Sequence, residues 1–191
     1  MNPTTDKIRQ KQFEGILALL VFGLTIPAAN WLIGNAGTVC VPEGPCLIPV
    51  APGIMAPSGV LMIGLALVAR DIVQRRLGAK AALGAIVVGT ALSALLAPQA
   101  IVIASAAAFL LSELADFAVY TPLQRKRFVT AVVLSSVVGL VVDSAVFLQL
   151  AFGSLDFFAG QVIGKAWMVL LAVPFIHWLR QRDARIGLAP A

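Results

Sequence analysis

Two acidic side chains interrupt an apolar stretch of helix length, residues 101–121. Glu113 and Asp116 stand three residues apart, so a helix presents both carboxylates on one face, with Ser112 and Tyr120 close to them. Ionisable groups inside a membrane-spanning helix are costly unless they face other helices, a cavity or a partner. Glu113 and Asp116 are therefore candidate functional residues. The alternative is that both reach water or backbone groups near the cytoplasmic end of the helix.

A second pair of buried charges is expected in the next two apolar runs, 128–150 and 157–179. Asp143 lies about 15 residues after the start of its run, and Lys165 lies about 14 residues before the end of its own. On consecutive antiparallel helices these two side chains reach the same level. We expect them to pair with each other or to flank one polar ligand. A purely structural ion pair between the two helices is the alternative.

The composition shows what kind of element carries these charges. The chain has 191 residues, of which 60% are hydrophobic and only 12% are charged, and its mean hydropathy is +0.95. These values describe an integral membrane protein, and the long apolar runs differ from the alternating pattern of an outer-membrane barrel. We predict an all-α, polytopic membrane protein with one transmembrane domain, residues 1–191. The net charge of +5 lies in short clusters between the runs, so no nucleic-acid partner is expected.

Six membrane spans are predicted from the apolar runs. The first run is longer than the core of a typical signal peptide and lacks a clean cleavage site, so a retained helix is favoured. The third run is rich in alanine and glycine, which suits close packing against other helices rather than exposure to lipid. The predicted spans are residues 16–31, 58–77, 81–96, 101–121, 128–150 and 157–179.

The basic residues alternate between the ends of these spans. Lys and Arg number three before the first span, four around the end of the second, three after the fourth and three after the sixth, with none in the other connections. The positive-inside rule then places the N- and C-termini in the cytoplasm. Residues 34–57 lie outside and are rich in Gly and Pro, which predicts a loop. For Cys40 and Cys46 in this loop, a disulfide and two free thiols both remain open.

Other polar residues have ordinary structural explanations. Asp71 lies beside Arg70 and Arg75 at the inner end of the second span, where a surface ion pair is expected. We interpret His177, beside Trp178, as an interfacial anchor. Intramembrane proteolysis would need a G-x-G-D motif or a histidine at membrane depth, and the sequence has neither, so we expect no enzyme, no cofactor and no metal site. The chain has no P-loop, so any ATP coupling must come from another protein.

A resemblance to a known family is carried by four short segments, RDIVQRRLGAKAA, SELADFAVY, VVGLVVDSAVF and GKAW. Their order and spacing resemble the queuosine-precursor transporter family, formerly described as vitamin uptake transporters of unknown function. The resemblance covers about residues 58–179. One position departs from the family pattern, because Leu140 stands where a polar residue usually precedes the aspartate of the fifth span.

In that family a D-x-(T/V)-x-x-x-x-G segment, a Q/E-x-x-D pair, a later D-(S/T) and a lysine in the last span recur. The resemblance implies import of a 7-deazaguanine precursor of queuosine, or a similar small heterocycle, across the bacterial inner membrane. The matching residues are Asp71 to Gly78, Glu113 with Asp116, Asp143 with Ser144, and Lys165.

The residues are compatible with such a ligand. A guanine-like edge presents two adjacent N–H donors, which a carboxylate such as that of Glu113 can accept as a charge-assisted pair. Aromatic rings on the polar spans can stack on the flat ligand, although each is more often plain packing. The expected partners are this small molecule and membrane lipid, and homo-oligomers remain open. The substrate-binding residues expected are Glu113, Asp116, Asp143, Lys165, Phe117, Phe147 and Trp167.

A second function of a different kind also fits six spans of this size. The chain would then be the substrate-binding membrane subunit of an ATP-driven vitamin or micronutrient uptake complex. Uptake by cells that express this chain, measured with and without a candidate ATPase module, distinguishes the two functions.

Overall fold

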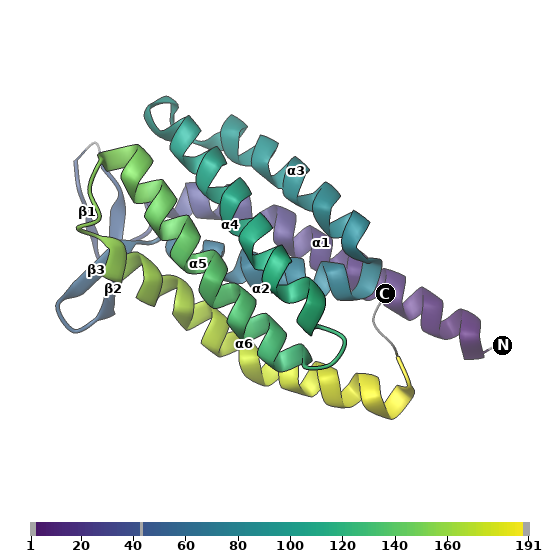
Figure 1. The fold of residues 1–191 in the computed structure, drawn as a ribbon. Helices are drawn as coiled ribbons and strands as arrows, with labels where there is room; N and C mark the ends of the chain where they lie inside the picture. The colour runs from purple at the N-terminus through teal and green to yellow at the C-terminus, as the bar shows by residue number, and fades with distance from the viewer. Residues whose placement is uncertain (1–2, 43, 189–191) are drawn as a thin grey trace.

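Six α-helices and one small sheet make up the protein (Figure 1). The computed structural model describes residues 3–42 and 44–188. The all-α membrane class is confirmed, because five of the helices, all except α2, are long and apolar enough to cross a membrane. The helices are α1 (Pro3–Asn35), α2 (Val60–Leu77), α3 (Ala79–Leu96), α4 (Val102–Leu123), α5 (Phe128–Phe152) and α6 (Phe158–Ile186), with a 3₁₀ turn at Gln99–Ile101 between α3 and α4.

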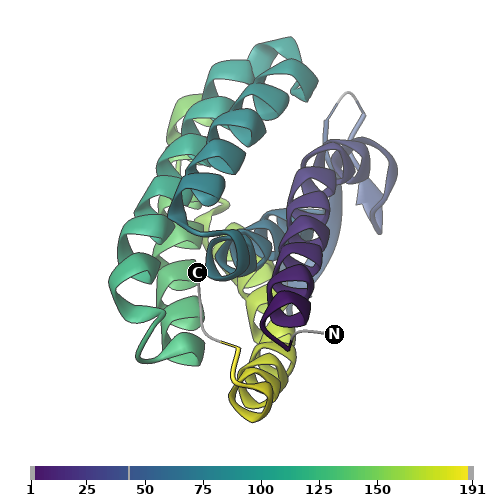
Figure 2. The same ribbon diagram turned by 90° about the vertical axis from the view of Figure 1, so that its right-hand side faces the viewer.

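Helix α2 is the most polar helix and lies in the middle of the bundle. It contacts each of the other five helices, and Figure 2 shows it between α1 on one side and α3, α4 and α5 on the other. Its polar residues, among them Arg70, Asp71, Arg75 and Arg76, are buried against these neighbours. Because lipid cannot satisfy such groups, the surrounding helices must do so. The helix with the highest density of charged residues is thus the one most fully shielded from lipid.

The helices extend beyond the apolar runs that predicted them. Helix α1 begins at Pro3 rather than near residue 16, and α6 continues to Ile186 rather than ending near residue 179. The helical hydrogen bonding continues through Gly15 in α1 and past residue 179 in α6, so both helices extend beyond the hydrophobic stretch. Helix α1 begins and α6 ends at the same end of the bundle, opposite the sheet (Figure 1). The side of the membrane on which this end lies remains a prediction.

The segment predicted as a Gly- and Pro-rich loop forms a three-stranded antiparallel sheet instead, so that prediction was wrong. Cys40 lies directly opposite Cys46 across the first two strands, and the two form a disulfide. Gly53, with a positive φ of 72°, makes the turn between the second and third strands. Most of the glycines and prolines lie at turns and strand ends here, whereas Pro49 lies inside the second strand, next to an irregularity in its pairing with the third. The strands are β1 (Val39–Cys40), β2 (Cys46–Ala51) and β3 (Ile54–Pro57), in the order β1-β2-β3.

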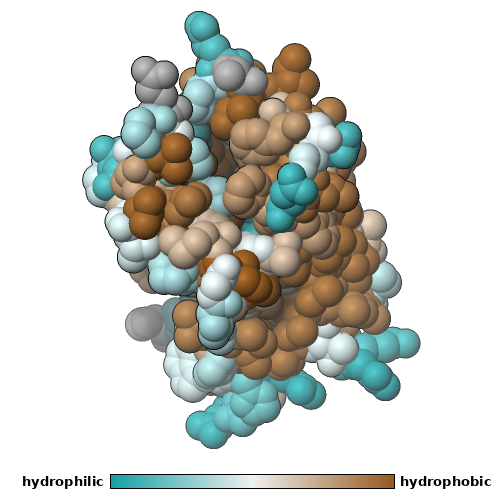
Figure 3. All heavy atoms as spheres, turned by 90° about the vertical axis from the view of Figure 1, so that its left-hand side faces the viewer, coloured by the Kyte–Doolittle hydropathy of each residue, from teal (hydrophilic) through white to brown (hydrophobic). Residues whose placement is uncertain are grey.

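Helix α3 was expected to pack away from lipid, and this is only half right. Gly89 does lie against the ring of Phe109, whereas Gly84 has open space around it. Two large side chains, Val87 and Leu95, are 66% and 79% exposed. The helix therefore lies at the edge of the bundle (Figure 1) and packs with one side only. Viewed from the sheet end, hydrophobic side chains cover much of the surface, with hydrophilic ones in separate patches toward the rim (Figure 3).

Candidate functional site

Buried polar side chains gather in three groups along the bundle. The cavity group consists of Asp143, Ser144, Gln161 and Lys165, toward the sheet end. The Arg70 cluster lies further along α2, and the Asp183 network lies near the end where α6 finishes. The Arg70 cluster consists of Arg70, Asp71, Gln74, Glu113, Asp116 and Ser135, and the Asp183 network of Glu14, Arg75, Arg76, Arg182 and Asp183.

A cavity of about 100 Å³ lies between the helices below the sheet. All six helices and strand β3 contribute to its lining, which is largely apolar. Two aromatic rings face it, Phe109 from α4 and Phe147 from α5. The charged side chains of the lining are Asp143 and Lys165, with Gln161 beside them. An apolar cavity with a few convergent polar groups is the usual form of a small-molecule site.

The expected pairing of Asp143 and Lys165 is confirmed. The ammonium of Lys165 lies 2.6 Å from Oδ2 of Asp143, and it donates to Ser144 Oγ at 2.8 Å and to Gln161 Oε1 at 2.6 Å. These three partners use all three donors of the ammonium. The Lys165 side chain is 1% exposed and that of Asp143 is 10% exposed. Asp143 is therefore the member of the pair that offers an acceptor to the cavity.

Leu140, the residue that departs from the family pattern, points away from the site. It is buried in the largest apolar cluster of the protein. Its carbonyl oxygen accepts a hydrogen bond of 2.7 Å from the hydroxyl of Ser144, which in turn accepts from Lys165. The position supports the cavity group through its backbone, so an apolar side chain there is compatible with the pair.

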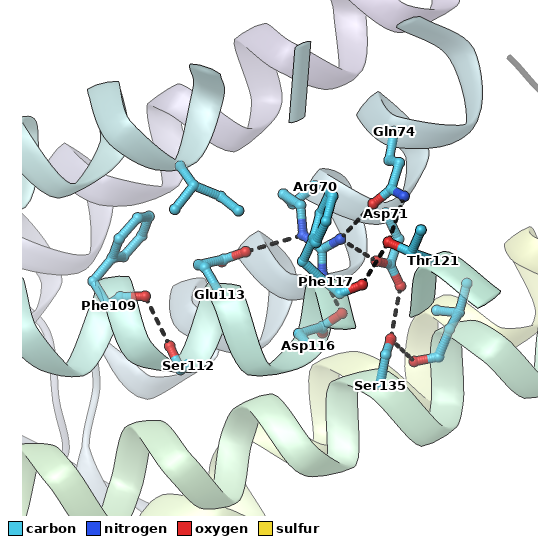
Figure 4. A network of polar contacts seen from close by, with 12 residues as sticks. Arg70, Asp71, Gln74, Phe109, Ser112, Glu113, Asp116, Phe117, Thr121 and Ser135 are labelled. Carbon is cyan, nitrogen blue, oxygen red and sulfur yellow. Dashed lines mark hydrogen bonds and ion pairs between the residues drawn. The ribbon is translucent and has the colours of Figure 1, made fainter. Parts of the chain in front are cut away.

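Glu113 and Asp116 do share one face of α4, and the group opposite them is Arg70 (Figure 4). Arg70 Nε donates to Glu113 Oε2 at 3.1 Å, and Nη2 donates to Asp116 Oδ1. Nη1 donates to Gln74 Oε1 at 3.0 Å and lies 3.1 Å from Asp71 Oδ1. Every one of these five residues is at most 1% exposed. The two carboxylates therefore bind a cation of the protein itself.

Asp71 is fully buried, so the expected surface ion pair was wrong. Its Oδ2 accepts a hydrogen bond of 3.1 Å from Ser135 of α5, and its Oδ1 faces Arg70 (Figure 4). The guanidinium of Arg70 lies 5.8 Å and 5.6 Å from the ring centres of Phe117 and Tyr120, which is within cation–π range. The sequence shows that Asp71 follows Arg70, but it does not reveal that three other helices cover this part of α2.

The Asp183 network closes the end of the bundle opposite the sheet. Arg76 donates to both carboxylate oxygens of Asp183, at 2.9 Å and 2.8 Å, and its Nε lies 2.8 Å from Oε2 of Glu14. Arg75 donates to Asp183 as well, and Arg182 pairs with Glu14. These contacts join α1, α2 and α6. Arg75 and Arg76, which we counted among the basic residues of a connection, are thus buried helix residues.

The structure divides the seven expected substrate residues among different places. Asp143, Lys165 and Phe147 line the cavity. Glu113 and Asp116 belong to the Arg70 cluster, and Phe117 lies against Arg70. Trp167 is 49% exposed and donates its indole N–H to the carbonyl oxygen of Val50 in β2, at 2.8 Å, so it ties α6 to the sheet.

Sequence reasoning missed three residues that now belong to the sites. Gln161 stands one helical turn before Lys165 on the same face, and this spacing could have indicated it. Phe109 likewise precedes Glu113 by one turn. Arg70 had only a weak signal, since its partners lie 43 and 46 residues away. Within residues 3–42 and 44–188, no His, Cys, Asp and Glu side chains are grouped as a metal site would need.

Comparison with protein families gives one match. Residues 94–179 match the model of a family described as putative vitamin uptake transporter. Comparison with curated proteins and with solved structures gave no match. The matched stretch holds Glu113, Asp116, Asp143, Ser144 and Lys165 of the resemblance, whereas the segment from Asp71 to Gly78 lies outside it. The match over residues 94–179 agrees with the family resemblance that the motifs indicate.

Proposed function

We propose that the protein imports a 7-deazaguanine precursor of queuosine, or a similar small heterocycle, across the bacterial inner membrane. The family match supports a multi-pass membrane transporter of vitamin-like substrates. The observation that carries the narrower proposal is the cavity, where one carboxylate and two aromatic rings face the same space. This combination suits a flat ligand with N–H donors on one edge.

The carboxylate of Asp143 is the specificity group in this proposal. A guanine-like ring has a ring N–H next to an exocyclic amine, and a carboxylate accepts both in charge-assisted hydrogen bonds. An adenine-like ring offers an acceptor at the corresponding ring nitrogen, which would face the carboxylate without a proton between them. Asp143 therefore favours guanine-like over adenine-like rings. Phe109 and Phe147 provide apolar surface for the faces of the ring.

Lys165 acts mainly by positioning Asp143. Its three donors are already used by Asp143, Ser144 and Gln161. A ring carbonyl that receives a hydrogen bond from Lys165 must first displace one of these partners, and Gln161 is the neutral one that also lines the cavity. Gln161 can meanwhile turn its amide toward the ligand. The pair thus keeps the carboxylate of Asp143 oriented before the ligand arrives.

Binding to the purified protein tests the site. We would measure the affinities of 7-deazaguanine, guanine and adenine for the wild type and for Asp143→Asn. Loss of the charged acceptor should weaken guanine-like ligands by about 10- to 100-fold, because hydrogen bonds to a charged group contribute ~1.5–3 kcal/mol. Asp156→Asn, which removes an exposed carboxylate in the turn before α6, is the matched control. Equal affinities for wild type and Asp143→Asn, or for guanine-like and adenine-like rings, would contradict the proposal.

Uptake by cells tests the transport step. Cells that express this chain alone should accumulate labelled 7-deazaguanine. Accumulation that requires co-expression of an ATPase module would instead favour the substrate-binding subunit of an ATP-driven complex.

A further inference from the structure

The Arg70 cluster contains more acidic groups than its cation can balance. Asp71, Glu113 and Asp116 surround one guanidinium, and all four side chains are at most 1–2% exposed. One positive and three negative charges would leave a net charge of −2 inside the bundle if every carboxyl were ionised. Uncompensated charge at this depth is strongly unfavourable. The cluster must therefore bind an additional positive charge.

The geometry of two of the carboxyls identifies that charge as a proton. Asp71 and Asp116 come from different helices, and their Oδ1 atoms contact the two neighbouring nitrogens Nη1 and Nη2 of the same guanidinium. Two carboxyl groups can form a hydrogen bond only if one of them is protonated. Oδ2 of Asp116 has no hydrogen-bond donor among the described residues, although the residue is fully buried. A shared proton satisfies this oxygen.

The elements packed around this pair leave no space for a metal ion beside Oδ2 of Asp116. A Cβ atom added at Gly139 of α5 would meet Oδ2 of Asp116 at 3.3 Å, so the backbone of α5 closes this side. The acidic groups of the described residues also lack the arrangement that a metal ion needs. A proton needs only the two carboxyl oxygens.

The neighbouring elements add few other ionisable groups to the pair. Helix α2 presents Arg70, with Arg75 one turn beyond, and α4 presents Glu113 and the phenol of Tyr120. Helix α5 presents the hydroxyl of Ser135. Its own acidic residue, Asp143, is held by Lys165 of α6 in the cavity group. Among the described residues, Arg70 is thus the cation in direct contact with Asp116.

The pair also lies between the cavity and the far end of the bundle. On α2, Ile63 lines the cavity, Arg70 and Asp71 follow about two turns later, and Arg75 and Arg76 of the Asp183 network come after them. On α4, Phe109 lines the cavity one turn before Glu113. A ligand that moves on from the cavity toward the far end of the bundle must therefore disturb the helices that form the acid pair.

We propose that Asp71 and Asp116 share a proton that enters with the substrate, so that the transport proposed above is driven by a proton gradient. The inference rests on that proposed function. Loss of the proton returns the cluster to a net charge of −2, which is unfavourable while the pair is buried, so the proton leaves only when water reaches the pair. Glu113 keeps the guanidinium in place through the bond to Nε. One proton accompanies each substrate molecule in this scheme.

Proteoliposomes that contain the full-length protein and a pH-sensitive dye test the proposal. Addition of 7-deazaguanine outside should acidify the lumen. An imposed gradient, acid outside, should raise the accumulation of labelled 7-deazaguanine by about tenfold per pH unit, since one unit corresponds to a tenfold change in proton activity. Asp116→Asn should still exchange labelled for unlabelled substrate but should lose this dependence. Asp156→Asn, the exposed control carboxylate, should keep both properties.

The outcomes separate this inference from the proposed function. Substrate exchange by the wild type without acidification of the lumen, or accumulation driven by a sodium gradient instead, would overturn proton coupling and leave the proposed function in place. A wild type that exchanges no 7-deazaguanine would overturn both. The dye measurement uses the wild type alone, so it decides the question even if Asp116→Asn does not fold.

Discussion

The cavity group and the Arg70 cluster use the same kind of contact in two different ways. In the cavity group one carboxylate meets one ammonium, and the carboxylate keeps some exposure to the cavity. In the Arg70 cluster three carboxyls meet one guanidinium, and nothing is exposed. The first arrangement is balanced and accessible, which suits recognition of a neutral ligand. The second is unbalanced and closed, which suits the binding of a proton.

The two groups also differ in which helices they join. Asp143 and Lys165 come from α5 and α6, which follow each other in the chain. Arg70 of α2 binds partners from α4, and Asp71 beside it binds Ser135 of α5. The Arg70 cluster therefore fixes helices that no short connection holds together. We expect it to contribute more to the stability of the bundle than the cavity group does.

Replacement of Arg70 should have the largest effect. Arg70→Ala leaves three buried carboxyls without their cation, which should destabilise the folded protein by ~3–5 kcal/mol. Thermal unfolding in detergent and the yield of folded protein measure the loss. Adding Asp71→Asn and Asp116→Asn to Arg70→Ala removes two of the three uncompensated carboxyls and should recover part of the lost stability. An unchanged unfolding temperature for Arg70→Ala would show that the cluster does not hold the bundle together.

The cavity pair should give a smaller effect with a clear sign of coupling. Asp143→Asn and Lys165→Met each leave one buried charge without its partner, and the double variant removes both charges. The double variant should therefore be more stable than the sum of the single effects predicts, by ~0.5–3 kcal/mol, in a double-mutant cycle from thermal unfolding. Asp156→Asn combined with Lys165→Met should give additive effects, because Asp156 lies in an exposed turn. Additivity in the Asp143 cycle would instead mean separate roles for the two residues.

Trp167 should have the smallest effect of the three. Trp167→Phe keeps an aromatic ring but removes the N–H bond to the carbonyl of Val50, which should cost ~1 kcal/mol of stability. The affinity for 7-deazaguanine should not change, because Trp167 does not line the cavity. A weaker affinity in the binding measurement would place Trp167 in the site after all. That result would mean that the binding site extends beyond the cavity group.

The sequence was sufficient to predict the pairing of Asp143 with Lys165. Both residues lie on regular helices that follow each other directly, so counting residues at a constant rise gives their relative depth. It was also sufficient to place Glu113 and Asp116 on one face, since the helical period decides this locally. The six helices were predicted near their positions because each contains an apolar run that the sequence shows directly.

The partner of Glu113 and Asp116 could not be predicted in this way. Arg70 meets them because α2 lies in the centre of the bundle, and the arrangement of helices depends on packing between segments far apart in the chain. The sheet was missed for a related reason. Its pairing depends on a disulfide and on contacts with α6, such as that of Trp167 with Val50, which hydropathy and residue type do not reveal.

The polarity of α2 has a consequence for how the chain enters the membrane during synthesis. A charged residue near the middle of a helix costs ~2.5–3.5 kcal/mol on insertion from the translocon into lipid, and α2 carries Arg70, Asp71, Arg75 and Arg76 within 18 residues. Its compensating partners, Asp116 on α4 and Asp183 on α6, are synthesised later. We therefore expect α2 to remain at the translocon or against α1 until those helices emerge, so the second helix is among the last to reach its final place.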